Sequence, residues 1–159
     1  MKIYVTSRQQ LTLDLWSGLL PRSISIEFVN GTSRSVQADV LVMSGVWAFD
    51  RYGGSPSREK AQVLSNSRGD GLPEWIVVPP FRPVVERGGE AFIREDFEQV
   101  SPAYHAVLQS LRAIRVEFGE SVRVVLDLSL LGMNDPHDDL TPSSVARAIE
   151  EFVNERAEA

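Results

Sequence analysis

The sequence contains no cysteine, only two histidines, and only two lysines, Lys2 and Lys60, among its 16 basic residues. Without cysteine the chain can form no disulfide framework, no thiolate metal site and no thiol nucleophile. Two histidines are also too few for a histidine-rich metal cage. We therefore expect neither a bound metal ion nor a cofactor, and we attribute the excess of arginine to composition rather than to a binding patch.

Basic charge and long apolar runs are scarce as well. The 159 residues carry a formal net charge of −6 and a pI near 4.9, a balance that opposes binding to phosphate backbones and membrane surfaces. Residues 1–5 form too short an apolar run for a signal peptide, and no later run approaches membrane-spanning length. We expect a cytoplasmic protein without a nucleic-acid or membrane partner. Its length and its 43% apolar content favour a single domain over residues 1–159.

Residues 38–56, ADVLVMSGVWAFDRYGGSP, form the central stretch of the sequence. Their apolar run at 40–43 predicts a strand that is buried on both faces. This strand leads through Ser44 and Gly45 into a segment that ends with Gly53 and Gly54, and the residues at 57–64 have the pattern of the first turns of a helix. Backbone N–H groups would then gather at the carboxyl end of the strand, where anions bind.

Further strands are predicted at residues 1–6, 23–29, 73–80 and 121–130. Helices are predicted at 101–119 and 141–153, because each of these segments begins with a hydroxyl residue followed by proline. Residues 7–20 are predicted as a helix capped by Ser7, although the alternation over 11–15 leaves a strand open there. Residues 81–99 lack a periodic pattern and are interpreted as a surface loop.

The alternation of strands and helices predicts an α/β fold, namely a three-layer α/β/α sandwich with a mixed, largely parallel central sheet. The inner strands at 40–43, 76–78 and 122–128 should be neighbours. In such a sheet, ligands bind beyond the carboxyl ends of adjacent inner strands. The loops at residues 44–55 and 129–139 are therefore expected to lie side by side and to form the main pocket.

The first of these loops offers four residues for chemistry. The Asp50 carboxylate could orient a water molecule or bind a ribose hydroxyl, and the Arg51 guanidinium could clamp a phosphate. We favour a solvated pair, because surface charge on loops is the ordinary case. Gly53 and Gly54 could cradle a phosphate, but a glycine pair forms a tight turn just as readily.

The second loop contains an acidic run around a histidine, with Asp135, His137, Asp138 and Asp139. Carboxylates and a histidine in this arrangement could form a metal site or supply a general base. Acidic residues just before Thr141 also suit the positive end of a helix dipole. We favour the structural interpretation.

The stretch from residue 42 to residue 54 resembles the macro domain signature, in which a buried strand ending in valine leads to an asparagine-alanine-alanine-asparagine segment and a triple glycine. Val42 takes the valine position, and Phe49 takes the apolar position seven residues on. Gly53 and Gly54 take the places of the second and third glycines, and Tyr52 replaces the first. The spacing of the signature is thus kept.

Downstream segments resemble the family in the same order. Residues 77–83 are similar to the segment that closes with glycine-proline, with Pro83 in register. Residues 121–132 resemble the strand that leads to the phosphate loop, and 141–153 resemble the final helix, so the likeness covers roughly three quarters of the chain. It implies a macro-like fold that binds ADP-ribose or a related nucleotide diphosphate, with Asp50 as a substitute catalytic acid. The candidate ligand-binding residues of the two loops are Ser44, Gly45, Arg51, Gly53, Gly54, Ser129, Gly132 and Asn134, of which Gly53, Gly54 and Ser129 match the family's motifs.

Several positions depart from the family pattern. No acid directly follows Gly31, where the family uses one on the adenine. Met43 and Val46 stand where the family has its two asparagines, and Leu130 and Leu131 replace small residues, so that their bulk would crowd a diphosphate. We therefore expect weak ADP-ribose binding and no robust hydrolase activity. The open alternative is a macro-like scaffold with a closed crevice, which acts through a protein partner.

Overall fold

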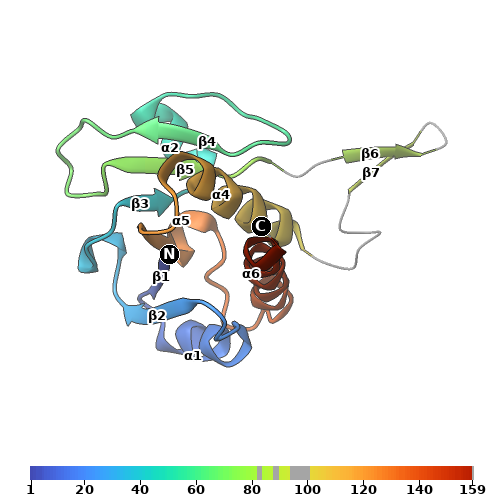
Figure 1. Ribbon diagram of the computed structural model, residues 1–159, viewed down its shortest axis with the longest axis horizontal. Helices are drawn as coiled ribbons and strands as arrows, with labels where there is room; N and C mark the ends of the chain where they lie inside the picture. The colour runs from blue at the N-terminus through green and yellow to red at the C-terminus, as the bar shows by residue number, and fades with distance from the viewer. Residues whose placement is uncertain (82–83, 88–89, 94–100, 159) are drawn as a thin grey trace.

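The computed structural model describes residues 1–81, 84–87, 90–93 and 101–158. Its central sheet consists of β1 (Lys2–Ser7), β2 (Ser25–Asn30), β3 (Val40–Val42), β4 (Gln62–Ser65), β5 (Trp75–Val78) and β8 (Arg123–Asp127). The strands lie in the order β2-β1-β8-β3-β5-β4 (Figure 1). β4 is antiparallel to β5, and the other neighbours are parallel. The predicted α/β class, the mixed and largely parallel sheet, and the adjacency of the three inner strands are confirmed.

The helices are α1 (Gln10–Leu19), α2 (Gly45–Tyr52), α4 (Pro102–Phe118), α5 (Leu128–Leu131) and α6 (Leu140–Glu158), with a short 3-10 helix, η1 (Ser33–Ser35). α4 begins as the sequence predicts, because the Ser101 side chain accepts a hydrogen bond from the Ala103 N–H and Pro102 is the first helical residue. It ends at Gly119, whose φ of 77° favours glycine.

Side chains from the two faces of the sheet enter two separate hydrophobic clusters. Val40 and Val42 belong to the cluster that contains residues of α1, α4 and α6, whereas Leu41 and Met43 belong to the cluster that contains residues of α2. This alternation is the two-residue period of a strand. All four side chains are 0% exposed, so β3 is the strand buried on both faces that its apolar run predicts.

The helix predicted for residues 57–64 is wrong. A helix does form nearby, but it is α2, which starts directly after β3 and occupies most of the segment expected to be a glycine loop. Residues 62–65 form β4 instead, with Val63 in contact with one hydrophobic cluster and Leu64 with the other. Pairing with β5 thus packs an apolar side chain on each face of the sheet. This packing favours a strand more than the charged residues at 58–60 favour a helix.

Other boundaries also differ from the prediction. α1 forms where a helix is predicted, so the alternative strand at 11–15 is wrong, but Ser7 ends β1 and Gln9 takes the cap position. The strand predicted for 121–130 ends at Asp127, where α5 begins.

Part of the loop predicted at 81–99 is also wrong, because β6 (Val84–Arg87) and β7 (Glu90–Ile93) form an antiparallel pair that projects from the body (Figure 1). Residues 82–83, 88–89 and 94–100, which include Pro83, lie outside the described residues. Within the described ranges, no helix combines the length and the apolar character needed to cross a membrane.

Candidate functional site

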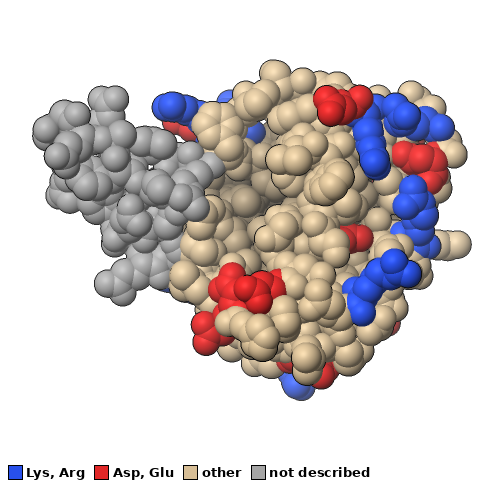
Figure 2. Space-filling view, turned by 180° about the vertical axis from the view of Figure 1, so that it is seen from behind, with Lys and Arg blue, Asp and Glu red and all other residues tan. Residues whose placement is uncertain are grey.

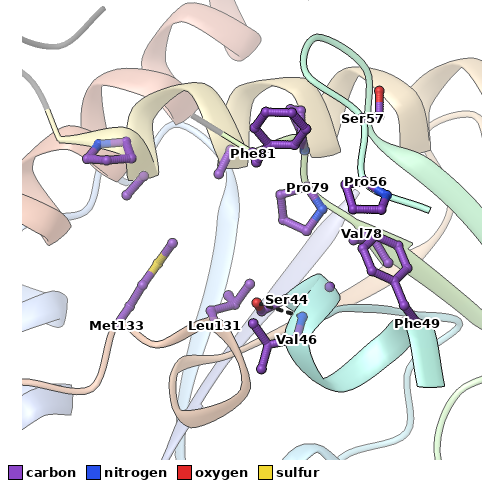
Figure 3. A pocket seen from close by; sticks show the side chains of 15 residues that line it. Ser44, Val46, Phe49, Pro56, Ser57, Val78, Pro79, Phe81, Leu131 and Met133 are labelled. Atoms are coloured by element: carbon purple, nitrogen blue, oxygen red, sulfur yellow. Dashed lines mark hydrogen bonds between the residues drawn. The ribbon is translucent and has the colours of Figure 1, made fainter. Parts of the chain in front are cut away.

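A pocket of about 660 Å³ lies at the carboxyl ends of β3 and β5 (Figure 3). This volume is in the range of small-molecule sites. Its walls come from α2, the segment between α2 and β4, the end of β5 and the residues after it, the start of α4, and the end of α5 with the residues after it. The lining residues include Ser44, Gly45, Val46, Phe49, Val78, Pro79, Phe81, Ala103, Ala106, Leu131 and Met133. In Figure 3, Phe81 lies on one side of the cavity and Leu131 and Met133 lie on the other.

The N-terminus of α2 forms the polar part of the wall. The Ser44 side chain caps the helix by accepting a hydrogen bond from the Val46 N–H at 3.4 Å, and the Ser44 carbonyl accepts from the N–H groups of Trp47 and Ala48. Gly45 is the first helical residue and also lines the pocket. The N–H groups of Val46, Trp47 and Ala48 thus already donate to Ser44, so the donor that this end of α2 can offer to a ligand is the Gly45 N–H.

Glycine at position 45 is explained by its contact with Phe49. A Cβ atom on Gly45 would fall 2.4 Å from Cε2 of the Phe49 ring. No real Cβ approaches another atom that closely, so the ring packs against the glycine because the side chain is missing there. Phe49 in turn lines the pocket, and thus Gly45 determines where one aromatic wall stands.

The lining that the structure describes is uncharged, and its side-chain hydroxyls come from Ser44 and Ser57. Two of its apolar side chains reach solvent, since Val46 is 81% exposed and Phe81 is 44% exposed. On the face shown in Figure 2, lysine and arginine lie mainly along one margin, and acidic residues lie at several other places. The cavity is therefore suited to an apolar or planar group more than to a free anion.

Both predicted loops contribute to this pocket, although only two of the predicted residues do. Ser44 and Gly45 line it, and the segment after β8 reaches it through Leu131 and Met133. The other predicted residues lie outside the described lining, namely Asp50, Arg51, Gly53, Gly54, Ser129, Gly132 and Asn134. The loops do meet, but through different side chains from those that the sequence suggested.

The glycine pair follows α2 and lies outside the described lining, two residues before Pro56, which does line the pocket. Gly53 follows the last helical residue, and its N–H donates to the Phe49 carbonyl at 3.2 Å. Gly53 and Gly54 both have φ of 85°, a conformation that glycine adopts without strain. The pair therefore ends a helix and turns the chain, and its role as a phosphate cradle stays a prediction. Asp50 and Arg51, in the last turns of α2, are exposed.

Ser129 and Asn134 hold the loop after β8 to the end of β1. The Ser7 hydroxyl donates to Oδ1 of Asn134 at 2.6 Å, and Nδ2 of Asn134 donates to the Ser129 hydroxyl at 3.3 Å. Ser7 also accepts from the Gln9 N–H at 3.0 Å. Gly132, with φ of 70°, ends α5. These residues thus organise the loop, and their polar groups are used within the protein.

Asp127 is a buried carboxylate that the sequence presents only as an interruption of a strand. It is 4% exposed, and its Oδ1 accepts from the N–H groups of Ser129 and Leu130 at 3.1 and 3.2 Å. Its Oδ2 accepts from the Ser33 N–H at 2.9 Å. Asp127 therefore caps α5 and holds η1 at the carboxyl end of β8. A buried carboxylate is expected to have its hydrogen bonds satisfied in this way.

Tyr52, which stands in the place of the family's first glycine, binds the turn at residues 66–72. Its hydroxyl donates to Oδ2 of Asp70 at 2.6 Å. Burial, and then this hydrogen bond, raise the pKa of Tyr52 to about 12. Burial alone would raise the pKa of Asp70, but hydrogen bonds from Asn66, Tyr52 and the Leu72 N–H outweigh it and lower this pKa to about 2.

The acidic run before α6 also has a structural role. Oδ1 of Asp138 accepts from the Thr141 N–H at 3.2 Å, and Oδ1 of Asp135 accepts from the His137 N–H at 2.9 Å. The Asp139 carbonyl accepts from the Ser143 N–H at 3.1 Å. Within the described part of the chain, no group of three or more His, Cys, Asp or Glu side chains is placed to hold a metal ion.

The leucine pair crowds the pocket less than its bulk suggests. Leu130 packs into the hydrophobic cluster on the α2 face, and its carbonyl accepts from the Ser44 N–H at 3.1 Å. Only Leu131 of the pair lines the pocket, which keeps its volume of about 660 Å³.

Comparisons with known proteins identify no family for this chain. No protein-family model matches the chain, and no curated protein matches it either.

Proposed function

We propose that the pocket binds a nucleotide of the ADP-ribose class, weakly, within a macro-like three-layer fold. One observation carries this proposal. The N-terminus of α2, with Ser44 and Gly45, opens into a cavity of about 660 Å³ at the carboxyl ends of the parallel strands β3 and β5. Ligands of open α/β sheets bind at this edge, and the Gly45 N–H at the start of α2 is a donor for a ligand oxygen. The resemblance to macro domains supplies the ligand class.

The affinity should be low because the polar partners of such a ligand are few. Met43 stands at one of the two positions where macro domains have an asparagine. It is 0% exposed and belongs to the core, so it cannot contact a ligand. Val46, at the other, lines the pocket with an apolar side chain. Each ligand hydroxyl left unpaired costs about 1–3 kcal/mol, and two such losses weaken binding roughly a hundredfold.

The proposed activity is binding rather than hydrolysis. The predicted acid, Asp50, is exposed and lies outside the described lining. A general acid or base must lie within hydrogen-bond reach of the reacting atoms, directly or through one water molecule. Among the residues that the structure describes, no carboxylate lines the pocket.

Isothermal titration with ADP-ribose tests the proposal on a matched pair of α4 variants. Ala106 lines the pocket, whereas Ala113 lies two turns further along the same helix and does not. We expect weak binding by the wild type and by Ala113→Phe, and none by Ala106→Phe, whose ring would fill the cavity. Absence of binding by the wild type, or unchanged binding by Ala106→Phe, would contradict the proposal.

A second candidate function is supported by exposed apolar side chains, two of which, Val46 and Phe81, line the pocket. Val46 and Trp47, adjacent residues of α2, are 81% and 47% exposed, and Phe81 is 44% exposed. Contiguous exposed apolar surface marks contact sites for proteins as well as ligand grooves. If the protein is a protein-binding scaffold, titration with ADP-ribose should show no binding. Sedimentation should then show association with another protein chain, and Trp47→Glu should remove this association.

A further inference from the structure

The described lining of the pocket is uncharged, so the anionic part of a nucleotide must find its cation at the rim. Phe81 stands at this rim, with its ring lining the cavity and 44% of the residue exposed. The guanidinium carbon of Arg58 lies 5.9 Å from the centroid of the Phe81 ring. A cation is thus held over an aromatic wall of the pocket.

The backbone fixes this arrangement. The Phe81 N–H donates to the Ser57 carbonyl at 2.9 Å, which joins the segment after β5 to the segment that carries Arg58. Pro56 and Ser57 line the pocket themselves, so Arg58 directly follows two wall residues. In Figure 3, Ser57 and Phe81 lie on the same side of the cavity.

The chemistry of arginine suits this position. A guanidinium can pack against a ring face while its N–H groups at the edge remain available, and its planar fork matches the oxygens of a phosphate. Arg58 is exposed, so its charge is already hydrated and needs no buried partner. Arg51, the arginine that the sequence pattern suggested, is in the last turn of α2 and outside the described lining.

We propose that Arg58 is the phosphate-binding residue of this pocket, and that Phe81 is the platform that positions its guanidinium. The base or ribose of the ligand occupies the apolar cavity, and its diphosphate lies at the mouth against Arg58. This inference rests on the proposed function and assigns the charged half of the same site.

NMR titrations at low ionic strength test the assignment with two ligands, ADP-ribose and adenosine, which lacks phosphate. The variants are Arg58→Gln and the matched control Arg51→Gln, both at exposed positions. We expect Arg58→Gln to weaken ADP-ribose binding about tenfold and to leave adenosine binding unchanged, because a charge-assisted hydrogen bond is lost. Arg51→Gln should change neither. Added salt should weaken ADP-ribose binding to the wild type more than to Arg58→Gln.

The possible outcomes separate this assignment from the proposed function. If Arg58→Gln affects ADP-ribose no more than Arg51→Gln does, the assignment is overturned while the proposed function stands. Equal weakening of both ligands would also overturn it, since Arg58 would then act by supporting Phe81 rather than by binding phosphate. If the wild type binds no ADP-ribose, both proposals fail. Thermal unfolding of each variant verifies that the fold is intact.

Discussion

The Ser44 N–H donates a hydrogen bond to the Leu130 carbonyl at 3.1 Å, and this contact joins the chain after β3 to the chain after β8. The two segments leave parallel neighbouring strands at the same edge of the sheet. The bond fixes the start of α2 against α5, so that Gly45 and Leu131 line one pocket. The candidate site thus depends on a backbone contact between two segments far apart in the sequence.

The first prediction concerns Gly45→Ala. A Cβ atom would lie 2.4 Å from the Phe49 ring, so the ring must shift within the pocket wall. We expect Gly45→Ala to be less stable in urea than Gly18→Ala by about 1 kcal/mol, because displacement of the ring offsets the helix-propensity gain only at position 45. Gly18→Ala is the control, since nothing lies within 4 Å of its added Cβ in α1, and it should stabilise by about 0.5–1 kcal/mol. Equal effects of the two changes would refute the packing role of Gly45.

The inner strands and the long helices could be predicted because their signals are local and strong. The run at 40–43 is apolar throughout, as a strand buried on both faces requires. Ser101, Pro102 and Gly119 mark both ends of α4 by their own chemistry.

α2 could not be predicted in this way, because of its eight residues only Ala48 is buried and Val46 and Trp47 face solvent. Ala48, Phe49 and Tyr52 do form an apolar stripe that packs against one cluster, but the exposed Val46 and Trp47 beside them hide this stripe in the sequence. Mistaking it for a loop also misplaced the site. A loop could bring Gly53 back beside Ser44, but an eight-residue helix separates its ends by about 12 Å. Arg58 was missed because its contact with Phe81 spans 23 positions of sequence and depends on the pairing of β4 with β5.

The second prediction concerns the glycine pair at the end of α2. A Cβ on Gly54 would lie 3.2 Å from Cδ2 of Leu64, whereas a Cβ on Gly53 would meet nothing within 4 Å. Both residues have φ of 85°, so valine at either position is strained, and the contact is added only at 54. We expect Gly54→Val to destabilise more than Gly53→Val in urea. If Gly54→Val kept its stability but lost ADP-ribose binding, the phosphate-cradle hypothesis would be supported.

The last prediction concerns the pH dependence set by Tyr52 and Asp70. The folded-state pKa of Asp70 is about 2, below its ordinary 3.8, so the unfolded chain binds more protons and stability falls as the pH drops from about 4 through 2. The folded-state pKa of Tyr52 is about 12, above its ordinary 10.0, so its contribution is complete below pH 10.0 and is lost as the pH rises towards 12. Tyr52→Phe removes the hydroxyl donor and should cost about 1 kcal/mol at neutral pH. It should also remove the alkaline loss and flatten the acid slope, as measured by urea unfolding across pH. Tyr4→Phe in β1 is the matched control, and a Tyr52→Phe profile that coincides with the wild type would show that this hydrogen bond contributes nothing to stability.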